Sequence, residues 1–142
     1  MNAYSNHYQN NQVMTASPEQ ILIMLFDGAI RFVRQAKLAI ENDRLNDKTA
    51  AINKAVAIIT EFSNTLNHEV GGEIAADLSQ LYDFMVRELS AVNARNDANR
   101  LDPVEKILLD LREGFAGAAE INRRGQAGVP QEAMERRVAA AL

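Results

Sequence analysis

Apolar side chains recur every three or four residues along most of this chain, and this periodicity restricts the fold more than any other feature. Such spacing places side chains along one face of an α-helix, whereas a half-buried strand needs strict alternation, which the chain lacks. Breaks rich in glycine, proline and asparagine divide the pattern into four segments with short connections. Helices joined in this way pack antiparallel to their neighbours. We therefore predict an all-α fold, an antiparallel up-down-up-down four-helix bundle.

Local signals set the expected helix boundaries. The stretch SPEQ at residues 17–20 is a helix start, because its serine can cap the amide of its glutamine and its proline suits the first helical position. The stretch DPVE at residues 102–105 repeats this pattern, with Asp102 as the expected cap, and Gly71-Gly72 interrupts the chain between two periodic segments. The predicted helices span residues 18–42, 46–67, 73–96 and 103–124.

Each predicted helix carries one apolar stripe that we expect to face the core. The four stripes consist of Leu22, Leu25, Ala29, Phe32, Ala36 and Ile40; Ile52, Val56, Ile59, Phe62 and Leu66; Ile74, Leu78, Leu81, Met85, Leu89 and Val92; and Val104, Leu108, Leu111, Phe115 and Ala119. The expected organisation is an N-terminal segment over 1–16, loose or docked on the bundle, the bundle domain over 17–124, and a tail over 125–142 that can form a short helix.

Composition excludes several classes of function. The net charge of -4 and the pI near 5.2 argue against general binding to nucleic acid or anionic membranes. The longest apolar run, residues 21–26, is far shorter than the roughly 20 residues that span a bilayer, so we expect no membrane insertion. The absence of cysteine and of a secretory signal in the first residues fits the cytoplasm.

The sequence also lacks the residue patterns of common catalytic sites. A di-iron bundle needs Glu-x-x-His pairs, but the residues three before His7 and His68 are Tyr4 and Thr65. The glycine pairs lack the Gly-Lys-Ser/Thr ending of a phosphate loop. We expect no enzyme, no metal and no cofactor, and therefore a protein that binds another protein chain.

The first helix is more apolar than a bundle requires. A second series with the same spacing, Ile23, Phe26, Ile30 and Val33, lies mostly outside the first stripe, so we expect Ile23 and Ile30 to point away from the bundle axis. Tyr82 and Phe84 flank the stripe of the third helix, and Leu109 falls on the solvated face of the fourth. The N-terminal segment or a partner can cover the second series, and both can do so in turn.

Several blocks of residues resemble the family of the flagellar secretion chaperone FliS. These blocks are Thr15-Ala16-Ser17-Pro18-Glu19-Gln20, Met24-Leu25-Phe26-Asp27-Gly28-Ala29-Ile30, Gly71-Gly72-Glu73-Ile74-Ala75, Leu78, Leu81-Tyr82-Asp83-Phe84-Met85, then Asn93, Asn96 and Asp97, with Tyr4 or Tyr8 in the leader. Phe26 and Phe84 stand where many relatives would have tyrosine, and Phe115 where tryptophan is expected. The tail beyond Arg123 matches nothing in the family pattern.

The resemblance implies a cytosolic chaperone that binds the disordered C-terminal segment of flagellin, prevents premature polymerisation and presents this client to a component of the flagellar type III export gate. It also implies that Tyr4 to Val13 covers part of the binding surface in the empty chaperone. The expected partner-binding residues are Tyr4, Tyr8, Val13, Ile23, Phe26, Ile30, Val33, Tyr82 and Phe84. The alternative is a self-associating structural bundle without a flagellin client, and we expect a monomer or a weak homodimer.

Overall fold

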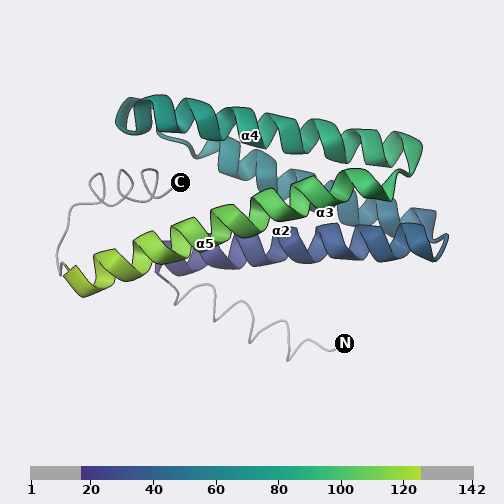
Figure 1. Ribbon diagram of the computed structural model, residues 1–142, viewed down its shortest axis with the longest axis horizontal. Helices are drawn as coiled ribbons and strands as arrows, with labels where there is room; N and C mark the ends of the chain where they lie inside the picture. The colour runs from purple at the N-terminus through teal and green to yellow at the C-terminus, as the bar shows by residue number, and fades with distance from the viewer. Residues whose placement is uncertain (1–16, 126–142) are drawn as a thin grey trace.

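The computed structural model describes residues 17–125 as four long helices and one 3₁₀ turn (Figure 1). The elements are α2 (Pro18–Glu41), α3 (Leu45–Asn64), α4 (His68–Arg95), η1 (Ala98–Arg100) and α5 (Leu101–Gly125). The expectations of a loose N-terminal segment and a short C-terminal helix concern residues outside this described part.

Successive long helices run in opposite directions, so the predicted antiparallel up-down-up-down bundle is confirmed (Figure 1). α2 packs against α3 and α5, and α4 packs against the same two helices from the other side of the bundle. α5 crosses α2 obliquely, and its final turns project past the start of α2 (Figure 1). α2 therefore has two neighbours, and its buried arc must be wide enough to contact both.

The start of α2 follows the predicted capping box. The Ser17 hydroxyl accepts a hydrogen bond from the Gln20 amide at 3.3 Å, and the Gln20 side chain accepts one from the Ser17 amide at 2.9 Å. These two bonds satisfy backbone donors that the first turn of a helix leaves without partners. Capping signals in the sequence therefore located this helix end correctly.

The predicted start at residue 73 coincides with a kink at Gly72 that divides α4 into two helical segments, whereas the predicted start at residue 103 is wrong. α4 begins at His68, five residues before the predicted position, because the Asn67 side chain accepts a hydrogen bond from the Val70 amide at 3.0 Å. Gly72 interrupts the helical geometry within α4, with φ 53° and ψ -126°, so the predicted break appears as a kink. Asp102 is not a cap, because η1 precedes α5 and extends the helical path to Leu101.

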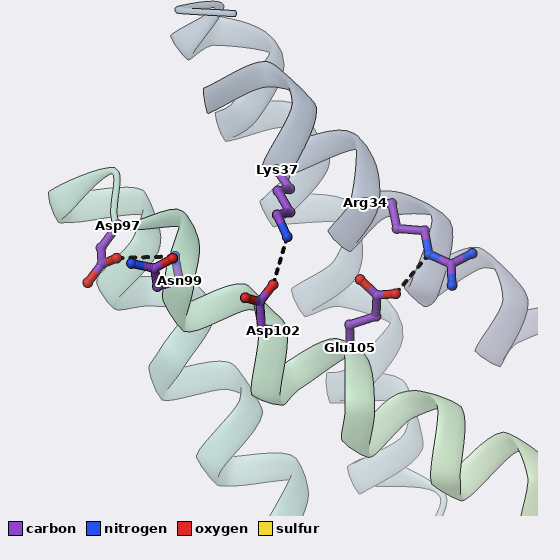
Figure 2. A network of polar contacts seen from close by, with 6 residues as sticks. All are labelled: Arg34, Lys37, Asp97, Asn99, Asp102 and Glu105. Carbon is purple, nitrogen blue, oxygen red and sulfur yellow. Dashed lines mark hydrogen bonds and ion pairs between the residues drawn. The ribbon is translucent and has the colours of Figure 1, made fainter. Parts of the chain in front are cut away.

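The turn before α5 has its own cap. The Asp97 carboxylate accepts a hydrogen bond from the Asn99 amide at 3.1 Å and so begins η1 (Figure 2). α4 ends at Arg95, and its C-cap Asn96 has a left-handed backbone (φ 56°) that closes the helix. Asn is one of the few residues that adopt this conformation at modest cost. The Asn96 and Asp97 positions thus form the sharp connection between α4 and α5.

The core changes in character along the bundle. Near the start of α2, aromatic rings from all four helices meet. The ring centroid of Phe26 lies 4.4 Å from that of Phe62 and 5.4 Å from that of Phe115, and both pairs are stacked. The ring centroids of Phe62 and Tyr82 lie 5.8 Å apart. Towards the end of α2 the core is aliphatic and contains small residues. Its members there include Ala36, Ala39, Ala51, Ile52, Ala55, Leu89, Val92, Leu101, Val104 and Leu108.

Lys48 is a buried cation at the aliphatic end. Its residue is only 4% exposed, and its ammonium donates hydrogen bonds to the Asn93 carbonyl oxygen at 3.0 Å and to the Asn96 side-chain oxygen. The last carbonyls of a helix lack intrahelical donors and carry the negative end of the helix dipole. Lys48 of α3 therefore joins the start of its own helix to the end of α4.

Candidate protein-binding surface

The second apolar series of the first helix is largely part of the core. Phe26 is 0% exposed, Val33 1% and Ile30 5%, so the expectation that Ile30 points away from the bundle axis is wrong, and the bundle itself covers Phe26 and Val33. Ile23 is half-buried and packs against the core from its edge. These four residues do not form a free client groove.

The error has a geometric cause. Because α2 packs against α3 on one side and α5 on the other, the line along α2 that points into the core runs between the two apolar series. Phe32 of the first series lies towards α3, where the Lys54 ammonium sits 5.4 Å from its ring centroid. Ile30 of the second series lies towards α5, where it lines a surface depression together with Leu109. Each series therefore has buried members that pack against a neighbouring helix and half-buried members at the edge of the core.

Tyr82 is also a core residue, not an exposed flank. It is 3% exposed and contacts Phe62, and its burial raises the pKa of its hydroxyl to about 12. Desolvation disfavours the phenolate, which explains the direction of this shift. Phe84, on the other side of the same stripe, remains half-buried at the edge of the core. Tyr4, Tyr8 and Val13 lie outside the described residues.

Apolar side chains that are covered on one side only define the candidate binding surface. We call eight half-buried residues at the edge of the core the flank surface, a set of positions on α2 and α4, two helices that lie diagonally across the bundle; it consists of Leu22, Ile23, Leu25, Phe32, Ile74, Leu81, Phe84 and Val86. Packing against the core fixes one side of each side chain, and the other side remains open to water. Contact with another chain would remove that remaining apolar area from water.

Four large apolar side chains within residues 17–125 are exposed outright, and only Leu109 among them was predicted from the sequence to face solvent. Leu38 is 57% exposed, Leu45 47%, Leu109 39% and Ile121 68%. Leu38 belongs to neither apolar series of its helix, and Arg34 and Glu41 stand about one turn before and after it. An apolar residue out of phase with the stripe was therefore the signal that pointed to it.

Leu38 and Leu109 lie on the same side of the molecule, at the seam between α2 and α5. We call the hollow there the α2–α5 depression; its apolar lining is Ile30, Leu38 and Leu109, and its cationic lining is Arg31, Arg34 and Arg112. A second hollow towards α3 shares Leu38 with it. Leu38 thus stands between two concave areas on the outer face of α2.

Three ion pairs cross the same seam in one antiparallel register. Arg112 pairs with Asp27. Figure 2 shows the other two pairs: the Arg34 guanidinium lies 3.0 Å from the Glu105 carboxylate, and the Lys37 ammonium lies 2.9 Å from the Asp102 carboxylate. Each step along α2 from one pair to the next is matched by an equal step back along α5. Ile30 and Leu109 occupy the matching positions between the first two pairs.

These ion pairs are exposed, so they contribute little to the stability of the fold, but they fix the alignment of α5 along α2. The side chains of Arg112 and Asp27 are 37% and 48% exposed, and such pairs typically contribute about 0 to 1 kcal/mol. The hydrogen bond from Arg112 to Asp27 raises the pKa of the guanidinium, with a further Coulombic contribution from the same carboxylate. A pairing shifted by one turn would lose these contacts, so the pairs specify the register of α5 on α2.

Neither a cluster of metal-binding side chains nor a membrane-spanning helix is found in the described part of the chain. Within residues 17–125, no group of three or more His, Asp or Glu side chains is placed to hold a metal ion. None of the helices in this part of the chain is long and apolar enough to cross a bilayer. The surface features that remain are apolar areas bordered by charge, which are suited to contact with protein.

Comparison with known proteins agrees with this description. The family of the flagellar protein FliS matches residues 1–122. The flagellar secretion chaperone FliS of Salmonella typhimurium is 41% identical over 114 residues, covering 80% of this chain and 84% of the relative, and that of Bacillus subtilis is 37% identical over 121 residues, covering 85% and 90%. A crystal structure of a bacterial flagellar chaperone has the same fold, with a TM-score of 0.69 at 23% identity, covering 82% of this chain and 95% of that one.

Proposed function

Because this chain belongs to the FliS family of flagellar secretion chaperones, we propose that it acts in the cytosol on flagellin. In this proposal it binds the disordered C-terminal segment of flagellin, prevents premature polymerisation and assists delivery to the flagellar type III export apparatus. The family role is that of a chaperone and not of an enzyme. The observation that carries the choice of a polypeptide client is the flank surface, where apolar side chains are covered from the core side only.

The physical logic follows from what an unfolded client offers. A disordered segment with amphipathic stretches can wrap around a rigid scaffold and fold as it binds. Such coupled folding typically buries about 1,000 to 3,000 Å² and costs about 2 to 5 kcal/mol in ordering the segment. The ordering cost keeps affinity moderate, and moderate affinity suits a client that must be released at an export gate.

Occupancy of the flank surface would also explain how polymerisation is prevented. The apolar side chains that a flagellin terminus buries in a filament would instead be buried against Leu81 and Phe84 of α4 and Ile23 of α2. No nucleotide or covalent step is needed for this effect. Residues 1–16, which include Tyr4, Tyr8 and Val13, would compete with the client for the same area and lower its apparent affinity by the fraction of chaperone already covered.

Calorimetry tests the proposal with two forms of flagellin. One is full-length, and the other lacks about the last 40 residues, which would span roughly 60 Å if helical. We expect binding to the first and none to the second. A matched pair of substitutions locates the surface: Ile23→Glu places a charge on the flank surface, and Leu45→Glu places the same charge on an exposed leucine at the first turn of α3. Ile23→Glu should weaken binding about tenfold or more, whereas Leu45→Glu should change it less than about twofold.

Three results would contradict the proposal. If truncated flagellin binds as tightly as the full chain, the C-terminal segment is not the part of flagellin that this chain binds. Equal losses of affinity for both variants would show that binding does not depend on the flank surface. Concentration-dependent dimerisation that buries Ile23, with no affinity for flagellin, would favour the self-associating bundle instead. Circular dichroism melts of both variants separate loss of binding from loss of fold.

A further inference from the structure

The outer face of α2 carries a concentration of positive charge that the proposed flagellin surface does not use. Three arginines and one aspartate line the α2–α5 depression, which gives its lining a net charge of +2, whereas the whole chain carries -4. The adjoining hollow towards α3 adds Arg44 and Lys54 against Asp47. The lining of the α2–α5 depression therefore has a charge opposite to that of the whole molecule.

Neighbouring carboxylates neutralise only part of this charge. Arg112 and Arg34 are held by Asp27 and Glu105 across the seam. Arg31 forms no ion pair with any residue in 17–125; its guanidinium carbon lies 5.2 Å from the Phe32 ring centroid. Arg31 is exposed, and it stands one turn from the Asp27–Arg112 pair. An anionic group placed over the depression would therefore find at least one cation without a competing carboxylate.

Apolar side chains lie within the same hollow. Leu38 and Leu109 are two of the most exposed large apolar residues in the described chain, and Ile30, itself only 5% exposed, lines the same hollow. Ile30 and Leu38 are eight residues apart on one helix, or about 12 Å. That separation matches two anchors about two turns apart on a partner helix. A free phosphate or a nucleic acid backbone would leave these leucines uncovered.

We propose that the α2–α5 depression is a second docking surface, which binds an acidic amphipathic helix of a partner protein. Its apolar anchors would cover Leu38, Ile30 and Leu109, and its Asp or Glu side chains would face Arg31 and the outer edges of Arg34 and Arg112. Arginine and buried apolar anchors are the residue types that dominate binding energy in such interfaces. The surface lies on the α5 side of α2 and goes beyond the proposed client surface, so it requires no flagellin.

A designed helical peptide tests the proposal with the full chain. The probe has about 16 residues, roughly 24 Å of helix, with leucines at i, i+4 and i+7 and glutamates on the flanking positions. A second peptide has every glutamate replaced by lysine. Fluorescence anisotropy should show binding of the glutamate peptide, weaker binding as salt rises, and no binding of the lysine peptide.

Two variants and one matched control place the peptide. Arg31→Glu and Leu109→Gln should each weaken the glutamate peptide about tenfold. Arg87→Glu makes the same charge reversal at an exposed position on α4 and should change affinity less than about twofold, because charges beyond a Debye length are screened. None of the three side chains is buried, and thermal melts confirm that each variant folds.

The outcomes separate this surface from its alternatives. No binding of the glutamate peptide, equal losses for Arg31→Glu and Arg87→Glu, or equal binding of the lysine peptide would overturn the proposal. So would tight, Arg31-dependent binding to phosphatidylserine vesicles without peptide binding. Flagellin affinity should be unchanged in Arg31→Glu; if it falls with that of the peptide, the depression belongs to the client surface and is not a second site.

Discussion

Replacing Lys48 by methionine tests how the bundle closes at its aliphatic end. Lys48 is 4% exposed and donates to the Asn93 carbonyl and the Asn96 side chain, where α4 ends. No carboxylate takes part in these hydrogen bonds. Methionine keeps most of the apolar stem and removes the charged donor, so the substitution isolates the polar contribution from packing.

The expected cost follows from the contacts that are lost. A hydrogen bond to a charged group contributes about 1.5 to 3 kcal/mol, and a cation at a helix C-terminus adds about 0.3 to 1 kcal/mol. Two effects offset this. Asn96 is exposed, so water can replace its bond, and methionine avoids the desolvation of an ammonium group. We expect a net loss of about 2 kcal/mol in the free energy of unfolding, or a Tm lower by about 6 to 8 °C for a chain of this size.

Urea unfolding followed by circular dichroism measures this loss, and Lys106→Met is the matched control. The Lys106 ammonium also lies near an oxygen, 3.1 Å from the Asp110 carboxylate, but its side chain is 76% exposed. Exposed pairs one turn apart contribute about 0.5 kcal/mol at most. If Lys48→Met is as mild as Lys106→Met, the buried ammonium does not hold the end of α4, and the reasoning from burial is refuted.

Three further predictions concern the core and the backbone. Phe26→Ala should cost about 3 to 5 kcal/mol of unfolding free energy, because a fully buried ring stacked on two others leaves a cavity; a loss below about 1 kcal/mol in urea unfolding would place the ring outside the core. Gly72→Ala should destabilise the fold by about 1 to 3 kcal/mol because Gly72 has a positive φ, whereas Gly117→Ala, at an open position within α5, should stabilise it by about 0.5 to 1 kcal/mol. Thermal melts in which both substitutions shift Tm in the same direction would contradict this. Burial raises the pKa of Tyr82 to about 12, so the folded state holds its proton longer than the unfolded chain does, and stability should fall as pH rises from about 10 to 12; Tyr82→Phe should reduce that fall in melts across this range, and an unchanged slope would show that Tyr82 is not its source.

Most of the fold could be predicted because helix periodicity and capping are local properties. The capping box at Ser17 and the stripes through Leu78, Leu89 and Leu108 depend on residues a few positions apart, and the structure has them as expected. The start of α4 was less predictable, since Asn67 and Gly72 both offer boundary signals. Which of two signals caps a helix depends on what the segment packs against.

The binding residues were harder to predict for the same reason. Whether Ile30 and Val33 are buried depends on how many neighbours α2 has, and one helix taken alone does not contain that information. Tyr82 was placed on a flank of its helix, but contact with Phe62 puts it in the core. Exposure of Leu38 was detectable in principle, because it is out of phase with both apolar series. Sequence patterns specify a face, and tertiary packing decides how wide that face is.

Hydrogen exchange on flagellin is the most direct test of the central claim, that this chain folds a disordered C-terminal segment of flagellin onto itself. Monomeric flagellin is mixed with an equimolar amount of the chain, and amide exchange is followed by mass spectrometry. We expect exchange in the C-terminal segment to slow by about 100-fold or more, because amides that enter stable helical hydrogen bonds exchange only when those bonds open. Unchanged exchange in that segment, at concentrations where the two proteins form a complex, would contradict the account.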